Sequence, residues 1–235
     1  MKMTRTALAL TAGVLAPALL LATPSLATAA PVTASASTVI GSDTENAAAI
    51  ARILADPASG RGVIREANEA LSGTPEDRVA FLTTGYAKAQ DEDNMVAIFR
   101  ILHTNPATGL QVKREAVAAL EGTPADRAAF VATGFAKARD DDHKVAILRI
   151  LHANPVTGKG VKREANKALD GTPADRTAFL ATGMRLAQAE DDRVDVARIL
   201  ARPGISAALR AAAEKAIEGT PEELRHFITV GQYQV

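Results

Sequence analysis

The sequence contains no cysteine, no tryptophan and very few other aromatic residues. Its 235 residues include two tyrosines and six phenylalanines. The lack of cysteine excludes disulfide scaffolds, thiolate zinc sites and cysteine nucleophiles. The scarcity of aromatic side chains disfavours surfaces that stack nucleic-acid bases or sugar rings. Because no disulfide can stabilise the chain, it must bury a sizeable core made mainly of alanine, leucine, isoleucine and valine.

The sequence also lacks an excess of charge and lacks hydrolase signatures. Lysine plus arginine equals aspartate plus glutamate at 27 each, so no net field attracts nucleic acid or an anionic membrane. Neither Gly-x-Ser-x-Gly nor His-Glu-x-x-His occurs. We therefore expect a protein that is not an enzyme, and we assign no catalytic, cofactor-binding or metal-binding residue.

The first thirty residues have the features of a secretory signal. Lys2 and Arg5 precede an uncharged stretch rich in leucine and alanine at 7–22, and a small-residue cleavage pattern ends at Ala29. A glycine and a proline interrupt the apolar stretch, which is too short for a membrane anchor. These features predict a signal peptide at 1–29, cleavage near Ala29 and a secreted protein without a membrane span.

A long-period internal repeat organises the remaining chain. The tripeptide Gly-Thr-Pro recurs at intervals of 49, 49 and 48 residues, starting at Gly73, Gly122, Gly171 and Gly219. A fixed period of this size indicates one structural unit copied along the chain. After a flexible lead-in at 30–42, we expect four units at about 43–91, 92–140, 141–190 and 191–235.

Each unit is predicted to contain three short helices. The first carries an Arg-Ile-Leu pattern and stops before a proline, whose ring disfavours helix in the preceding residue. The second is expected to end at the glycine of Gly-Thr-Pro, in a left-handed conformation. Threonine then caps the third helix, with proline in its first position and Asp or Glu completing a capping box. The expected fold is all-α, a solenoid-like array of helical repeats.

A phenylalanine in the third helix is followed four residues later by glycine in every unit. The glycines are Gly85, Gly134, Gly183 and Gly231. Glycine inside a helix costs about 1 kcal/mol relative to alanine, so its recurrence needs a structural reason. We expect the phenylalanine and the glycine to form a knob and a gap where helices cross closely. A ligand cleft is the less favoured alternative, because no polar partner recurs in the pattern.

These residues resemble the ALF repeat, a family named for its alanine richness and recurrent phenylalanine. The resemblance covers roughly Asp43 to Val235 and rests on the run Gly-Thr-Pro-x-Asp-Arg-x-x-Phe-x-x-x-Gly, intact in three units. The fourth unit departs from it, with Glu223 and Leu224 in place of Asp-Arg. The resemblance implies export from an actinobacterium and a helical fold, and it implies no established activity.

Acidic clusters lie between the expected units. They are Asp91-Glu92-Asp93, Asp140-Asp141-Asp142 and Glu190-Asp191-Asp192. They lack the alternating spacing, the glycine and the final glutamate of a calcium loop. We expect them to cap the next helix and to favour its positive N-terminal end. Weak binding of cations or of a basic partner along an acidic row of Asp93, Asp142 and Asp191 is the alternative.

An arginine recurs in the otherwise apolar first helix and calls for a carboxylate partner. The four are Arg52, Arg100, Arg149 and Arg198. One hypothesis is a clasp between units that pairs Arg100 with Glu66, Arg149 with Glu115 and Arg198 with Glu164. The rival carboxylates are those of Asp77, Asp126, Asp175 and Glu223.

Histidines offer little evidence of a site. The four are His103, His143, His152 and His226. His103 and His152 occupy equivalent positions near a helix end, where a histidine complements the helix dipole. No second ligand type recurs beside both, which disfavours a metal. We expect His143 to be an exposed first-turn residue.

The pattern as a whole favours a secreted helical-repeat protein that binds another protein or a peptide across its stacked units. The row of Asn68, Val117 and Asn166 and the loops around His103 and His152 are the first surfaces to consider, and neither is assigned as a site. The alternatives are a structural or regulatory factor held to the cell envelope by charge and, less favoured, a hydrolase with an unrecognised site.

Overall fold

The computed structural model describes residues 41–104, 109–153 and 158–235. The predicted signal peptide at 1–29 and all but the last two residues of the lead-in at 30–42 lie outside these residues. Every regular element in the described part is helical, which confirms the predicted all-α class. Within the same part, no helix has the length and apolar character needed to span a bilayer.

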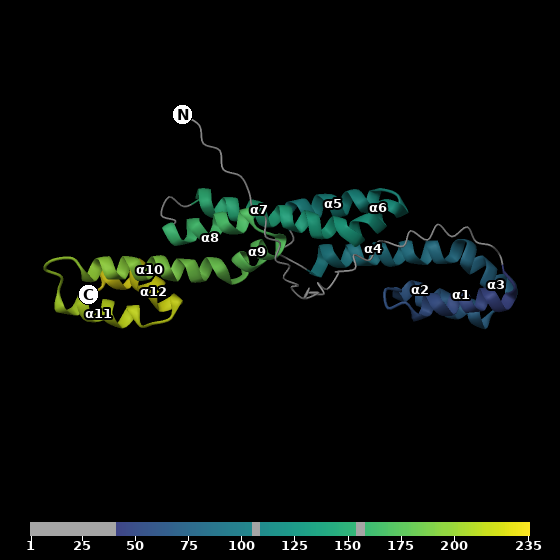
Figure 1. Ribbon diagram of the computed structural model, residues 1–235, viewed down its shortest axis with the longest axis horizontal. Coiled ribbons are helices and arrows are strands. Elements are labelled where there is room, and N and C mark those ends of the chain that lie inside the picture. Colours follow the sequence, from purple (N-terminus) through teal and green to yellow (C-terminus); the bar gives the residue numbers. More distant parts are fainter. Residues whose placement is uncertain (1–40, 105–108, 154–157) are drawn as a thin grey trace, which may run out of the picture. The chain divides into compact units, whose positions relative to one another are not determined.

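One order of helices recurs along the chain (Figure 1). The first unit holds α1 (Asp43–Ala55), α2 (Arg61–Ser72), α3 (Pro75–Ala80) and the π-helical turn η1 (Phe81–Gly85), which continues into α4 (Tyr86–Thr104). Next come α5 (Leu110–Glu121), α6 (Pro124–Ala129), η2 (Phe130–Gly134) and α7 (Phe135–Ala153). Then follow α8 (Lys159–Asp170), α9 (Pro173–Ala178), η3 (Phe179–Gly183) and α10 (Met184–Leu200). The chain closes with α11 (Ala207–Ile217), α12 (Pro221–Thr229) and the 3-10 turn η4 (Gly231–Tyr233).

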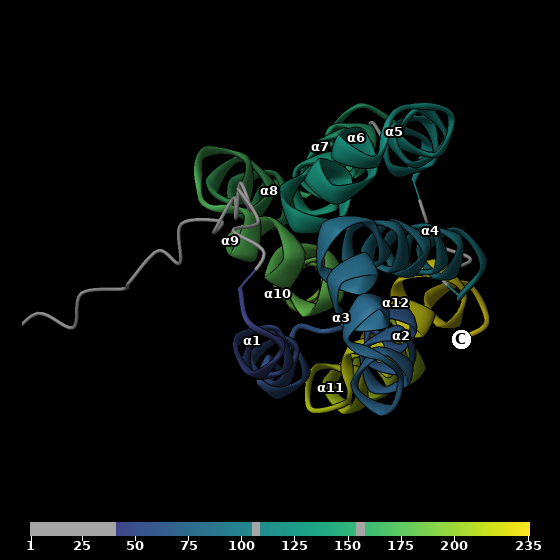
Figure 2. The same cartoon turned by 90° about the vertical axis from the view of Figure 1, so that its right-hand side faces the viewer.

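The long helices α4, α7 and α10 are each shared by two units. Helix α4 packs against α2 of the preceding unit and also against α5 and α6 of the next. In both views α5 lies alongside the run from α6 to α7, which repeats the relation of α2 to α4 (Figures 1 and 2). The third helix of one unit and the first helix of the next are therefore continuous, and the expected boundary at 91/92 falls inside α4.

Each unit has a small core of the expected composition. In the second unit Ile98, Ala116, Ala119 and Phe130 are buried against one another. The clusters of the other units likewise contain isoleucine or valine, at least two alanines and one phenylalanine. Alanines let the helices approach closely, so phenylalanine supplies much of the buried apolar area.

The Gly-Thr-Pro corner has the predicted capping box in all four units. In the first, the Thr74 backbone N–H donates to Asp77 Oδ2 at 2.7 Å and the Asp77 N–H donates to Thr74 Oγ1 at 3.2 Å. The prediction of a left-handed conformation at this glycine is wrong, because Gly73 has φ −88° and ψ −157°. A Cβ at Gly73 would lie 2.5 Å from Asp77 Oδ2, so the carboxylate of the capping box requires glycine there.

In the first three units the phenylalanine–glycine pair forms a π-helical turn rather than a crossing of helices, whereas in the fourth unit Gly231 begins the 3-10 turn η4. A Cβ on Gly85 would lie 3.2 Å from Cδ2 of Phe81, four residues earlier in the same run. The Tyr86 N–H reaches back to the Phe81 carbonyl, which widens the turn. The predicted gap therefore exists, but it accommodates the ring of its own helix.

The acidic clusters do not cap the following helix as expected, because they lie inside α4, α7 and α10. One carboxylate of each instead caps the second helix of the preceding unit. Asp93 accepts the Gly62 N–H at Oδ1 (2.8 Å) and the Val63 N–H at Oδ2 (2.9 Å), at the N-terminus of α2. Asp142 and Asp191 cap α5 and α8 in the same way. The negative charge also complements the helix dipole, so this contact joins neighbouring helices.

A second carboxylate holds the arginine of the Thr-Pro-x-Asp-Arg run. Arg127 donates from Nε and Nη2 to the two oxygens of Asp91 at 2.6 and 2.7 Å, and from Nη1 to the Gly122 carbonyl at 2.8 Å. The same bidentate contact joins Arg78 to Asp43 and Arg176 to Asp140. Each arginine thus ties the end of the second helix to the first helix of its unit.

The Arg176 guanidinium, assisted by Lys144, lowers the pKa of Asp140 from 3.8 to about 2. Because the folded-state pKa is lowered, this ion pair stabilises the fold above pH 3.8, and its contribution is lost as the pH falls toward 2.

The carboxylates proposed for a clasp between units have other partners. Glu66, Glu115 and Glu164 each pair with the arginine that precedes them in sequence, and Arg198 pairs with Asp195. The rival carboxylates complete the capping boxes. The predicted pairings are therefore wrong in their residues. The recurring Arg-Ile-Leu arginines are exposed.

The fourth unit replaces both contacts. Leu224 and Ala189 take the positions of the buried arginine and its aspartate, and they are 0% and 2% exposed. Ser206 takes the position of the glycine before α2, and its hydroxyl accepts the Leu209 N–H at 3.0 Å. A local serine cap thus stands where the other units have an aspartate cap from a later helix.

Asp192 is a buried carboxyl group between α10 and α12. It is 1% exposed; Oδ1 accepts from Gln188 and lies 3.0 Å from Arg225 Nη2, whereas Oδ2 has no hydrogen-bond donor within the described residues. Burial raises its pKa, and Arg225 opposes the rise only in part. Folding therefore favours the protonated form of Asp192 more than the unfolded chain does. Any stability due to Asp192 is largest below pH 3.8 and is lost as the pH rises through the raised pKa.

We therefore expect Asp192→Asn, which matches Asn46 of the first unit, to gain stability relative to the wild type as the pH rises from 4 to 7. Urea unfolding at the two pH values measures this change. A stability difference between variant and wild type that does not change with pH would contradict the assignment, and Asp195→Asn serves as the exposed control.

Candidate functional site

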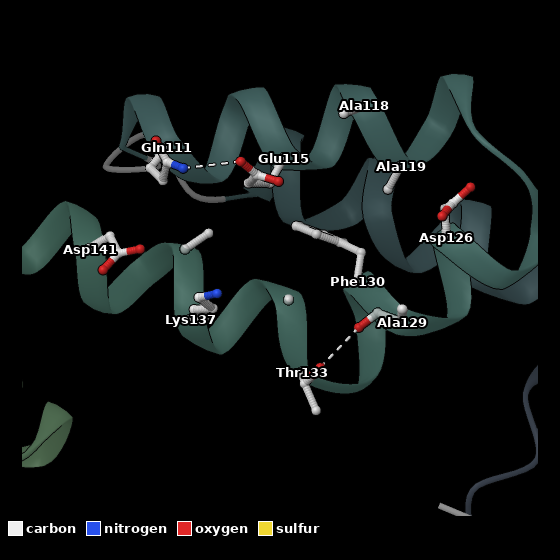
Figure 3. Close-up of a pocket in the computed structure, with 12 residues that line it drawn as sticks. Gln111, Glu115, Ala118, Ala119, Asp126, Ala129, Phe130, Thr133, Lys137 and Asp141 are labelled. Atoms are coloured by element: carbon white, nitrogen blue, oxygen red, sulfur yellow. Dashed lines mark hydrogen bonds between the residues drawn. The ribbon is translucent and has the colours of Figure 1, made fainter. Parts of the chain in front are cut away.

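A groove runs between α5 and the helical run from α6 to α7 in the second unit. Its volume is about 550 Å³. Figure 3 shows Phe130 rising from the lower run between the two walls, with Glu115 on the upper wall and Lys137 on the lower. The groove is open to solvent, and its size is in the range of pockets that accept small ligands or side chains of a partner.

The floor follows directly from the repeat. Phe130, Ala119 and Ala138 are buried beneath the groove. Gly134 carries no Cβ, and a Cβ there would lie 3.2 Å from Cδ2 of Phe130, so a larger residue would push the ring by a few tenths of an ångström. The π-helical turn and its small residues thus create an apolar floor that side chains do not fill.

The rim of the groove is charged. It carries the carboxylates of Glu115, Asp126 and Asp141 and the ammonium group of Lys137. Gln111 Nε2 donates to Glu115 Oε1 at 3.0 Å (Figure 3). The Thr123 hydroxyl and N–H both donate to Asp126 and lower its pKa, so this carboxylate is ionised at neutral pH.

A groove of the same construction lies in the third unit, between α8 and the run from α9 to α10. Its volume is about 570 Å³, and Phe179, Ala168 and Ala187 form its floor. Leu186 replaces Lys137 on one wall and is 53% exposed, so this groove is the more apolar of the two.

The surfaces suggested by the sequence lie next to these grooves. Asn68, Val117 and Asn166 are exposed on α2, α5 and α8, but neither Val117 nor Asn166 lines a groove. The loops after His103 and His152 fall partly outside the described residues. The recurring phenylalanine and glycine are the sequence signal for the groove, although the sequence favours packing over a ligand cleft at these positions.

The histidines lie apart from the grooves. His103 and His152 are in the last turns of α4 and α7, as expected, and His103 Nδ1 lies 2.9 Å from the Phe99 carbonyl. His143 is inside α7 rather than in a first turn, and it lies 3.3 Å from Thr177 Oγ1. Across residues 41–104, 109–153 and 158–235, no three His, Asp or Glu side chains converge in a way that could hold a metal ion.

The groove chemistry suits contact with a partner. Apolar floors accept side chains of a partner, and charged rims fix orientation. The lining side chains of the two grooves hold no hydroxyl or amine nucleophile hydrogen-bonded to a base.

A known family matches the chain. Short repeats of unknown function, known as ALF, match residues 48–89, 96–138, 144–187 and 193–235. No protein of curated function is similar to the chain at a significant level. The four matches cover most of the sequence and coincide with the four helical units, so the chain belongs to the ALF repeat family.

Proposed function

We propose that the protein is secreted and binds another protein or a peptide through the grooves of its second and third units. The observation that carries this proposal is the recurrence of one open groove, with the same phenylalanine floor and carboxylate rim, in two consecutive units. Repeated grooves let one extended partner make equivalent contacts with successive units. The charged amino terminus and apolar stretch before Ala29 support export.

The test is a capture experiment with a matched pair of variants. Residues 30–235 serve as bait against the secreted and cell-wall fractions of the producing organism, at low and high salt. Thr133→Arg with Thr182→Arg places a long cation in each groove. Ala132→Arg with Ala181→Arg adds the same charge one residue earlier, on exposed positions outside both grooves.

We expect to capture a partner that stays bound at high salt. The control pair should bind it as the wild type does, and the groove pair should capture at least about tenfold less. A partner lost equally with both pairs would contradict groove binding. A partner released from every bait by salt would favour attachment to the envelope by charge, because salt screens exposed charges. Capture of no partner would also contradict the proposal.

A further inference from the structure

The groove of the third unit has an acidic rim around an exposed apolar wall. Leu186 stands 53% exposed on that wall, above the buried ring of Phe179. Glu164 and Glu190 lie on the rim with Asp175, and Lys167 is the cation among the lining residues. A segment with apolar residues on one side and basic residues on the other matches this arrangement.

Arg163 already occupies the rim carboxylates from outside the groove. Its Nε lies 2.9 Å from Glu164 Oε1 on α8, and its Nη2 lies 3.2 Å from Glu190 Oε2 on α10. The Arg163 side chain is 63% exposed and that of Glu190 is 61% exposed. Ion pairs this exposed are weak and exchange readily with other partners.

The second unit lacks this bridge. Arg114, the residue equivalent to Arg163, pairs with Glu115 at 3.4 Å, and Asp141 pairs with Lys144 on its own helix. Lys137 also occupies the wall position that Leu186 holds in the third unit. The third unit therefore combines the more apolar wall with two carboxylates that one arginine holds across α8 and α10.

We propose that the groove of the third unit binds a cationic amphipathic peptide segment, whose basic side chain displaces Arg163 from Glu164 and Glu190. The apolar residues of the segment contact Leu186 and Phe179, and its lysine or arginine takes over the two carboxylates. Arg163 is then an internal competitor for the ligand charge. This inference rests on the proposed function and adds the chemistry of the partner and the residue that limits its binding.

The probe is a fluorescent amphipathic peptide made of leucine and lysine, and its counterpart has glutamate at every lysine position. Binding is measured by anisotropy at low and physiological salt with the wild type, Arg163→Ala and Arg210→Ala. Arg210 is an exposed arginine on α11, away from the groove, so its removal changes net charge by the same amount. Leu186→Ser and Thr182→Arg test whether the peptide lies in the groove.

We expect the lysine peptide to bind about threefold more tightly to Arg163→Ala than to the wild type, with no comparable change for Arg210→Ala. Leu186→Ser and Thr182→Arg should each weaken binding severalfold. Equal tightening in both arginine variants, or glutamate-peptide binding as tight as lysine-peptide binding, would overturn the charge selection alone. Binding insensitive to Leu186→Ser and Thr182→Arg, or no binding of either peptide, would overturn both this inference and a peptide-binding role for the groove.

Discussion

Arg127→Leu is expected to lower the free energy of unfolding by about 3–5 kcal/mol, the usual cost of removing one partner of a buried ion pair. The side chains of Arg127 and Asp91 are only 10% and 16% exposed, so the remaining carboxylate would lie largely out of water without its guanidinium. The carbonyl of Gly122 would lose its donor as well. Urea unfolding at neutral pH measures the loss.

The fourth unit indicates how the loss can be recovered. It has Leu224 and Ala189 at the arginine and aspartate positions, both buried, so an apolar pair is compatible with the fold. Adding Asp91→Ala to Arg127→Leu should therefore restore stability to within about 1 kcal/mol of the wild type. A double variant as unstable as the sum of the two single variants would show that the charges are not coupled. Arg114→Leu, at an arginine 68% exposed, is the control and should change stability by less than about 0.5 kcal/mol.

Asp93→Ala is expected to cost about 2–3 kcal/mol, because two backbone donors of α2 lose a charged acceptor. Glycine at the N-cap of α2 offers no side-chain substitute. The control is Glu92→Ala, which removes the adjacent carboxylate of the same cluster and should change stability by less than about 0.5 kcal/mol. Equal costs for the two substitutions would show that general charge, rather than capping, accounts for the effect.

The effect of Gly60→Ser on the free energy of unfolding should have opposite signs in the wild type and in Asp93→Ala. In the wild type the new Cβ would overlap the carboxylate of Asp93, so the substitution destabilises. In Asp93→Ala that space is free, and the backbone at Gly60 (φ −75°, ψ 171°) is close to that of the capping Ser206 (φ −61°, ψ 152°). Serine should then recover about 1 kcal/mol. Thermal or urea unfolding of the wild type, the two single variants and the double variant measures this double-mutant cycle. A serine that destabilises both backgrounds equally would contradict the prediction.

Local sequence determined the helices and their corners. The threonine and the acidic residue of each capping box are three residues apart, so the contact forms within one turn and can be predicted from the local sequence. The 49-residue period likewise fixed the number of units and the family, because it repeats apolar positions and helix breakers together. The same reasoning failed at Gly73, where glycine is needed for the nearby Asp77 carboxylate rather than for its own φ angle.

Tertiary structure decided the partners of the remaining charges and the existence of the grooves. Asp93 meets a backbone amide 31 residues earlier in the chain, and Arg127 meets a carboxylate 36 residues away. The sequence offers several carboxylates at comparable separations, and the packing of α4 on α2 and α6 selects among them. The groove beside Phe130 has the same origin, because space left between two helices depends on how they pack and on no residue alone.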